Sequence, residues 1–111
     1  MDTVNRYRDI IEQVLFAHTK IPSSIGEVQF QTVFDRDNDH YLVVQVGWGS
    51  QKRIYGVLAH IDLVGDKVWI QHDGTEEGLA NQLRDAGIPA EHIVLGYRIP
   101  EVRQHTGYAV A

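Results

Sequence analysis

The sequence predicts a two-layer α+β domain: an N-terminal helix, a four-stranded antiparallel meander, a helix pair and a C-terminal strand segment, with the helices on one face of the sheet. Three observations predict this class. Apolar residues near the N-terminus recur at helical spacing, strand-like runs with short turns follow, and a second helical pattern precedes one more apolar run. The 111 residues show no internal repeat and no shift of composition, so we expect a single domain over residues 1–111.

The N-terminal helix is predicted from Thr3 to about Thr19. Its inner side recurs at steps of three and four residues: Val4, Tyr7, Ile10, Ile11, Val14, Leu15 and His18. Asp2 or Thr3 can cap the first turn, because a short polar side chain accepts hydrogen bonds from backbone N–H groups that lack a partner in the helix. Pro22 and Gly26 are expected to end the helix and the turn after it.

Four strand-like runs are predicted to form the antiparallel meander. They cover residues 27–35, 40–48, 53–63 and 67–72. The turns between them are too short for a parallel crossover, which needs a dozen or more residues. In the last turn Gly65 lies where a two-residue hairpin requires a positive φ. The second run is the more apolar, so we expect it to be a central strand.

The first run predicts a sheet with one face in solvent. One side of this run carries apolar residues and the other carries polar ones, an alternation typical of such a sheet. The apolar residues are Val28, Phe30 and Phe34, and the polar residues are Glu27, Gln29 and Gln31.

A further helix is predicted where residues 75–87 read TEEGLANQLRDAG. Leu79, Leu83 and Ala86 are expected to face inward, with Gly87 as the C-terminal stop. A short helical turn at 88–92, with Pro89 suited to its first position, and a fifth apolar run at 93–99 follow. The uncharged end at 107–111 is expected to complete the sheet or to lie in a subunit interface, because a free apolar end frays unless it is docked.

The acidic residues before this helix have a structural explanation. Asp73 precedes Glu76 by three residues, which is the spacing of a capping box, in which each side chain accepts a hydrogen bond from the other residue's backbone N–H group. Thr75 is an alternative cap. Glu76 and Glu77 also lie where the start of a helix carries partial positive charge. The stretch is therefore predicted to begin a helix and not to form an active site.

Composition excludes several classes of protein. Without cysteine the chain has neither a disulfide framework nor a thiol nucleophile, which suits a reducing compartment. No run approaches the roughly 20 apolar residues of a membrane-spanning helix, so we expect a soluble, cytoplasmic protein with no membrane partner. The 15 acidic and 10 basic residues give a net charge of −5, so strong autonomous binding to DNA is not expected.

A polar site formed by histidine and aspartate side chains is the main alternative to a structural role for the acidic residues before this helix. Its imidazole and carboxylate groups, which can bind zinc or act as a general base, belong to His60, Asp62, His72 and Asp73. Strand alternation places Leu58 on the face of His60 and Asp62, and points His72 and Asp73 to opposite sides. We therefore predict no catalytic residue, no metal and no cofactor. An enzyme that uses His60, Asp62 and His72 is kept as a third hypothesis.

Aromatic residues are candidates for an interface with another protein. These are Trp48, Tyr55, Trp69, Tyr97 and Tyr108. They could also stack on the bases of a single-stranded nucleic acid, but few basic residues lie near them, so packing is favoured. The second hypothesis is an accessory factor that contacts DNA through a small basic patch formed by Lys52, Arg53, Arg98 and Arg103.

The order of the motifs resembles the XisI family, the cyanobacterial fdxN element excision controlling factors. The resemblance covers about Tyr7 to Ala111 and is most specific in VWIQHDGTEEG at 68–78, IPAEHIVLGY at 88–97 and the terminal YAVA. It implies a small accessory protein linked to programmed removal of a DNA element during heterocyst development, in which a separate site-specific recombinase cuts and joins the DNA. It also implies a partner, XisH, which is similar to restriction endonucleases.

The leading hypothesis is therefore a non-enzymatic protein that regulates excision, or a nuclease-related partner, through protein contacts. An acidic surface is suited to covering a basic DNA-binding face, because complementary charge steers association. We expect a XisH-like partner and, for self-association, a dimer. The resemblance carries no established catalytic residue over to this sequence.

Overall fold

The structure of the chain is a computed structural model, which describes residues 2–20 and 26–111. Its elements in chain order are α1 (Thr3–His18), β1 (Glu27–Asp35), β2 (His40–Trp48), β3 (Arg53–Val64), β4 (Lys67–Asp73), α2 (Leu79–Asp85), the 3-10 helix η1 (Ala90–His92), β5 (Ile93–Leu95) and α3 (Pro100–Arg103). The α+β class is confirmed. Pro22, which was expected to end the first helix, lies outside the described residues.

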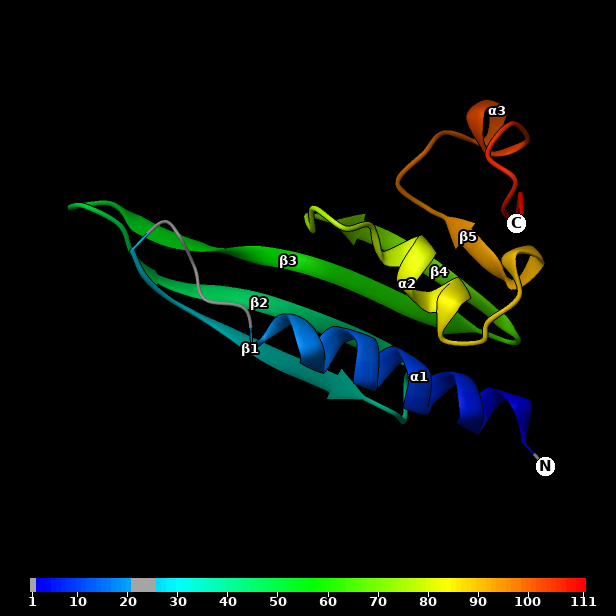
Figure 1. The fold of residues 1–111 in the computed structure, drawn as a ribbon, viewed down its shortest axis with the longest axis horizontal. Coiled ribbons are helices and arrows are strands. Elements are labelled where there is room, and N and C mark those ends of the chain that lie inside the picture. Colours follow the sequence, from blue (N-terminus) through cyan, green and yellow to red (C-terminus); the bar gives the residue numbers. More distant parts are fainter. Residues whose placement is uncertain (1, 21–25) are drawn as a thin grey trace.

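Within the described residues, five strands form one sheet in the order β1-β2-β3-β4-β5 (Figure 1). The first four strands form the predicted antiparallel meander, and Gly65 has the expected positive φ of 64° in the β3–β4 turn. β2, which was expected to be a central strand, lies in the interior of the sheet, and β3 is the middle strand of the five. β5 pairs with β4 in parallel, because α2 and η1 provide the long crossover that this direction requires.

Helices α1 and α2 pack against one another and against the same face of the sheet (Figure 1). The core lies between these two layers. Its fully buried side chains come from both helices, from the inner face of the sheet and from the segment after α2: Tyr7, Ile11, Leu15, Tyr41, Val43, Ala59, Ile61, Val68, Ile70, Leu79, Leu83, Ile88 and Ile93. The opposite face of the sheet, called the outer face below, is not covered by α1 or α2.

The N-terminal helix begins as predicted. Asp2 Oδ1 accepts hydrogen bonds from the backbone N–H groups of Val4 and Asn5, at 3.0 and 3.3 Å. At the other end the helix stops at His18, whose Nε2 lies 2.7 Å from Gln82 Oε1 of α2. The cap therefore sets the start of α1, and its last residue contacts the second helix.

A charged pair connects α1 to the sheet. Arg8 Nε and Nη2 donate to the two carboxylate oxygens of Asp39, at 2.8 and 3.0 Å. The buried Tyr41 donates its hydroxyl to Asp39 Oδ1 at 2.8 Å, and the backbone N–H of Leu63 donates to Asp39 O at 3.1 Å. The hydrogen bonds from Arg8 hold the pKa of Asp39 below its ordinary value. Asp39 thus joins α1, β2 and β3 at one end of the sheet.

The predicted capping box was wrong, because α2 begins at Leu79 and not near Thr75. The intervening Gly78 has a φ of 87°, which a helix cannot contain, so residues 74–78 form a loop. Asp73 organises this loop instead. Its Oδ1 accepts from the backbone N–H and the hydroxyl of Thr75 at 2.9 and 2.6 Å, and its Oδ2 accepts from the N–H of Leu79 at 2.8 Å. The acidic residue still has a structural role at the helix start.

The end of α2 was predicted correctly at Gly87, which has a φ of 120°. The backbone N–H groups of Ile88 and Gly87 donate to the carbonyl oxygens of Leu83 and Arg84, at 3.1 and 3.0 Å, which is the Schellman pattern. Ala86 is exposed, so its predicted inward position was wrong. The reversal of the chain at Gly87 brings Ile88 into the core in its place.

The end of the chain at residues 107–111 docks on its own chain. Ala109 forms a parallel bridge with Val94, and its backbone N–H donates to Ile93 O at 2.8 Å. Tyr108 packs against the core, and its hydroxyl donates to Asn81 Oδ1 of α2 at 2.8 Å. Of the two alternatives predicted for this end of the chain, the structure has the one that extends the sheet. Pro89 lies one position before its predicted place, as the cap of η1.

Truncation of one buried and one exposed side chain of β3 tests which face of the sheet is packed. Ile61 is fully buried, whereas Val64 is 59% exposed. The change Ile61→Ala should lower the free energy of unfolding by about 2–5 kcal/mol. The change Val64→Ala should lower it by no more than about 0.5 kcal/mol. Urea unfolding followed by circular dichroism measures both, and equal losses would contradict the assigned faces.

Deletion of residues 108–111 tests the docking of the chain end. We expect a loss of about 2 kcal/mol in unfolding free energy, because the Tyr108 contacts and the Ala109 hydrogen bond are removed. Deletion of Val110 and Ala111 alone is the control and should lower the free energy of unfolding by less. Light scattering should give the same mass for all three proteins. A changed mass for the longer deletion would show that this segment crosses between chains.

Candidate functional site

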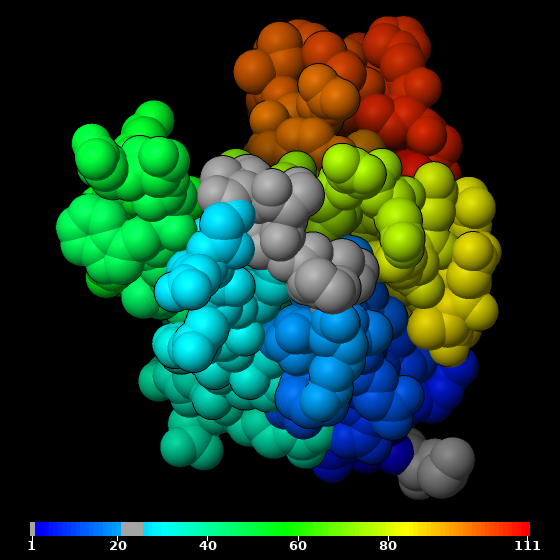
Figure 2. All heavy atoms as spheres, turned by 60° about the vertical axis from the view of Figure 1, so that its left-hand side comes forward, coloured from blue at the N-terminus to red at the C-terminus, as the bar shows by residue number. Residues whose placement is uncertain are grey.

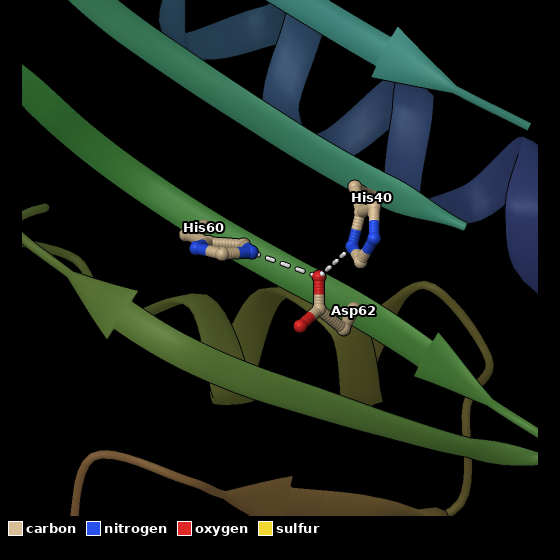
Figure 3. Close-up of side chains that lie close together, drawn as sticks. All are labelled: His40, His60 and Asp62. Atoms are coloured by element: carbon tan, nitrogen blue, oxygen red, sulfur yellow. Dashed lines mark hydrogen bonds and ion pairs between the residues drawn. The ribbon is translucent and has the colours of Figure 1, made fainter. Parts of the chain in front are cut away.

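Polar side chains from neighbouring strands meet on the outer face of the sheet (Figure 3). His40 Nδ1 and His60 Nε2 each lie within hydrogen-bonding distance of Asp62 Oδ1, at 2.7 and 2.8 Å. Asp62 Oδ2 accepts a hydrogen bond from Gln71 Nε2 at 3.2 Å. Strands β2, β3 and β4 therefore each contribute to one cluster. We call His40, His60 and Asp62 the polar cluster.

Strand pairing explains why these side chains meet. His40 lies directly opposite Asp62 in the β2–β3 ladder, and His60 is two residues earlier on the same strand as Asp62. Because side chains alternate along a strand, His60 and Asp62 share a face. Gln71 is the additional residue of a bulge in the β3–β4 ladder, and bulges commonly redirect a side chain. That side chain is directed at Asp62.

A second bulge corrects the predicted position of Leu58. Leu58 is the additional residue where β3 pairs with β2, and it packs against the core together with Ala59. Val57 and His60 consequently both lie on the outer face. The prediction that Leu58 shares the face of His60 was wrong, because it assumed unbroken alternation along β3. The apolar neighbour that argued against a site is therefore on the other side of the sheet.

The predicted polar residues divide into two groups. His60 and Asp62 come together as expected, whereas Asp73 lies on the helix side and binds the backbone of Leu79. His72 is exposed and lies opposite His60 in the ladder, so His72 and Asp73 do point to opposite faces. Sequence reasoning missed His40. Counting back along the ladder from the β2–β3 hairpin places His40 opposite Ile61, and only the bulge at Leu58 shifts it to Asp62.

The electrostatics of the polar cluster favour an ionised carboxylate beside a protonated imidazole. The hydrogen bond to Asp62, followed by the Coulomb attraction of the same carboxylate, raises the pKa of His40. Burial acts to raise the pKa of Asp62, but the hydrogen bonds from His40 and His60 outweigh burial and lower it. The same hydrogen bond thus favours the charged form of both His40 and Asp62.

The outer face also carries an apolar surface next to the polar cluster. Four of its side chains are clearly exposed: Val33 at 51%, Trp48 at 56%, Tyr55 at 72% and Val57 at 39%. Leu42, Val44 and Val46 connect them along β2, and Leu42 lies opposite His60. A contiguous apolar patch exposed on a protein surface typically marks an interaction site. We call this set the outer apolar surface: Val33, Leu42, Val44, Val46, Trp48, Tyr55 and Val57.

The five aromatic candidates do not share one surface. Trp48 and Tyr55 lie together on the outer face, beside the β2–β3 hairpin whose tip projects from the molecule (Figure 2). Trp69 is half-buried beneath the guanidinium of Arg103, which lies 5.1 Å from its ring. Tyr97 and Tyr108 lie in the part of the chain that follows β5, and Tyr108 is directed at α2.

The basic residues form two separate groups. Lys52 and Arg53 lie at the β2–β3 hairpin, whereas Arg98 and Arg103 lie before and within α3, at the other end of the molecule (Figure 1). Arg53 lies over the ring of Trp48 at 5.3 Å, and Arg98 over the ring of Tyr97 at 5.1 Å. The four residues therefore do not make one continuous basic patch. In the described part of the chain, no helix has the length and hydropathy needed to cross a membrane.

Comparison with known proteins places this arrangement in a family. A family model described as XisI protein matches residues 1–110. The chain belongs to the XisI family. A search of curated proteins finds no match. The resemblance drawn from the sequence motifs is thus confirmed, and the outer face described above belongs to a XisI domain.

Two solved structures share the fold of this XisI chain. A XisI-like protein from Anabaena variabilis ATCC 29413 is 33% identical with a TM-score of 0.88, and the match covers 97% of this chain and 99% of that one. The fdxN element excision controlling factor XisI from the same organism is 28% identical with a TM-score of 0.84, over 99% of this chain and 100% of that one. Both are similar along the whole XisI domain.

Removal of the Asp62 charge tests the coupling within the polar cluster. Asp62 stabilises the fold at pH values above its ordinary pKa of 3.8. This contribution is lost as the pH falls through its lowered pKa. His40 stabilises the fold below its ordinary pKa of 6.5, and this contribution is lost as the pH rises through its raised pKa. In EDTA-containing buffer, the stability lost in Asp62→Asn should therefore be largest between roughly pH 4 and 6.5 and smaller at pH 8.

Two measurements check this expectation. Urea unfolding of both proteins across the pH range gives the stability difference, and NMR titration of the imidazole resonances gives the pKa of His40. That pKa should fall towards its ordinary value in Asp62→Asn. A stability difference that does not vary with pH, or an unchanged pKa of His40, would contradict the coupling.

Proposed function

We propose that this XisI-family chain controls the excision of a DNA element by binding a partner protein, and that it does not itself cut or join DNA. The excision role is supported by its likeness to the fdxN element excision controlling factor XisI, over nearly the full length of both chains. The observation that carries the proposed mechanism is the outer apolar surface, which α1 and α2 leave uncovered and which has exposed aromatic and aliphatic side chains.

The outer apolar surface has the composition of a protein-binding site. Trp48 and Tyr55 are of the residue types that most often dominate binding energy when a partner buries them. Polar residues border them, including Arg53 at the hairpin and His60 at the opposite side of the surface. An apolar centre with a polar rim is typical of interfaces between proteins.

The proposed occupant is a XisH-like protein, the nuclease-related partner that the family resemblance implies. The chain has a net charge of −5, which suits a partner with a basic DNA-binding face because opposite charges steer the two proteins together. Direct contact with DNA is disfavoured, since the basic residues lie in two separate groups and three of the arginines lie over aromatic rings. Regulation would then act on the partner and, through it, on DNA.

Co-purification with a XisH-like protein tests this proposal. The double change Trp48→Ala with Tyr55→Ala should weaken the complex by at least about tenfold, because truncation of a central aromatic typically costs 2 kcal/mol or more. Phe16→Ala is the matched control, since Phe16 is 50% exposed but belongs to α1 in the other layer. It should bind like the unchanged protein. Isothermal titration calorimetry gives the affinities, and circular dichroism verifies that each variant is folded.

Three outcomes would contradict the proposal. The first is a double variant that binds the partner as tightly as the Phe16→Ala control. The second is retention of the chain alone on duplex DNA with a steep loss at higher salt, which is the behaviour of a protein that neutralises phosphates. The third is a stable dimer by light scattering that the double variant dissociates and the partner does not, which would assign the surface to a second copy of the chain.

A further inference from the structure

We propose that His40, His60 and Asp62 bind a divalent first-row transition-metal ion such as Zn²⁺ on the outer face of the sheet. One ligand atom from each residue lies within 4.8 Å of the other two. Two imidazole nitrogens and one carboxylate oxygen are a donor set that suits zinc, cobalt and nickel. This binding site extends beyond the protein-binding role proposed above, because it names a ligand that the outer apolar surface does not require.

The distances in the polar cluster allow an ion to enter with side-chain movement alone. Zinc lies about 2.0–2.2 Å from nitrogen and oxygen ligands, so tetrahedral ligand atoms are about 3.3–3.6 Å apart. Asp62 Oδ1 is now 2.7 and 2.8 Å from the two nitrogens, and no pair of ligand atoms is more than 4.8 Å apart. Shifts of roughly 1 Å in each side chain reach the required geometry. Small rotations about side-chain bonds provide such shifts.

The backbone already holds the three ligands in place. His40 and Asp62 are direct partners in the β2–β3 ladder, and His60 is two residues from Asp62 on the same face. Ligands carried by paired strands are positioned more accurately than ligands carried by loops. Gln71 adds an outer contact, because it donates to Asp62 Oδ2 and so leaves Oδ1 directed at the imidazoles. Metal-binding carboxylates are commonly held by such secondary hydrogen bonds.

The site is accessible and has two further carboxylates near it. The side chains of His40, His60 and Asp62 are 52%, 32% and 17% exposed, so an ion can reach them from solvent. Asp35 and Asp39 lie near enough to His40 to act on it electrostatically. Three protein ligands leave at least one coordination position for water or for a donor from another molecule. The three ligands lie on the same face of the sheet as the outer apolar surface.

Metal titration of the tag-free chain of residues 1–111, after removal of metal with EDTA, tests the site. Calorimetry with Zn²⁺ should show saturable binding of one ion per chain in the micromolar range or tighter. His60→Gln and Asp62→Asn should each weaken binding by at least about tenfold. His105→Gln is the matched control, because His105 is an exposed histidine near α3, away from the polar cluster. It should bind Zn²⁺ like the unchanged protein.

A measurement on the unchanged chain keeps the test valid if a variant fails to fold. In NMR spectra, Zn²⁺ should shift the ring resonances of His40 and His60 while those of His105 stay in place. No saturable binding, or binding that survives unchanged in folded His60→Gln and Asp62→Asn, would overturn the proposal. Resonance shifts at other histidines without shifts at His40 and His60 would also overturn it. Loss of the partner complex with Zn²⁺ binding intact would count only against the proposed function.

Discussion

The arrangement of the chain depends on one constraint: the sheet is covered by α1 and α2 on one face only. Strand β2 carries apolar residues on both sides for most of its length, and β3 adds Tyr55 and Val57 to its outer side. Because α1 and α2 lie against the same face, the core takes one set of these side chains and leaves the other set outward. The outer apolar surface is therefore a direct consequence of the layer order.

The polar cluster depends on the same sheet through a local irregularity. The bulge at Leu58 moves one residue of β3 to the helix side, which adds to the core and at the same time shifts the ladder so that His40 meets Asp62. One extra residue thus decides both a packing contact and a site. The cluster and the outer apolar surface are neighbours, since Leu42 lies opposite His60. A bound ion and a bound protein would face the same side of the molecule.

Much of the fold could be predicted from the sequence, because local signals determine it. Alternation and turn residues delimit the first four strands to within one residue, and Asp2 and Gly87 mark helix ends by hydrogen bonding and positive φ. The features of the fold that the sequence did not predict share a physical cause. The bulges, the parallel direction of β5 and the pairing of His40 with Asp62 are set by contacts between strands, which residue spacing along one strand does not contain. The late start of α2 depended on the conformation of a single glycine, Gly78.

We propose that this XisI-family chain meets its partner at the outer apolar surface. Trp48 reports on that face directly, and a Trp69→Phe background leaves it as the only tryptophan, since the sequence has two. Acrylamide quenching of its fluorescence should be strong in the chain alone, where Trp48 is 56% exposed, and should fall sharply once a XisH-like protein saturates the complex. Quenching that stays equally strong in the saturated complex would contradict the account.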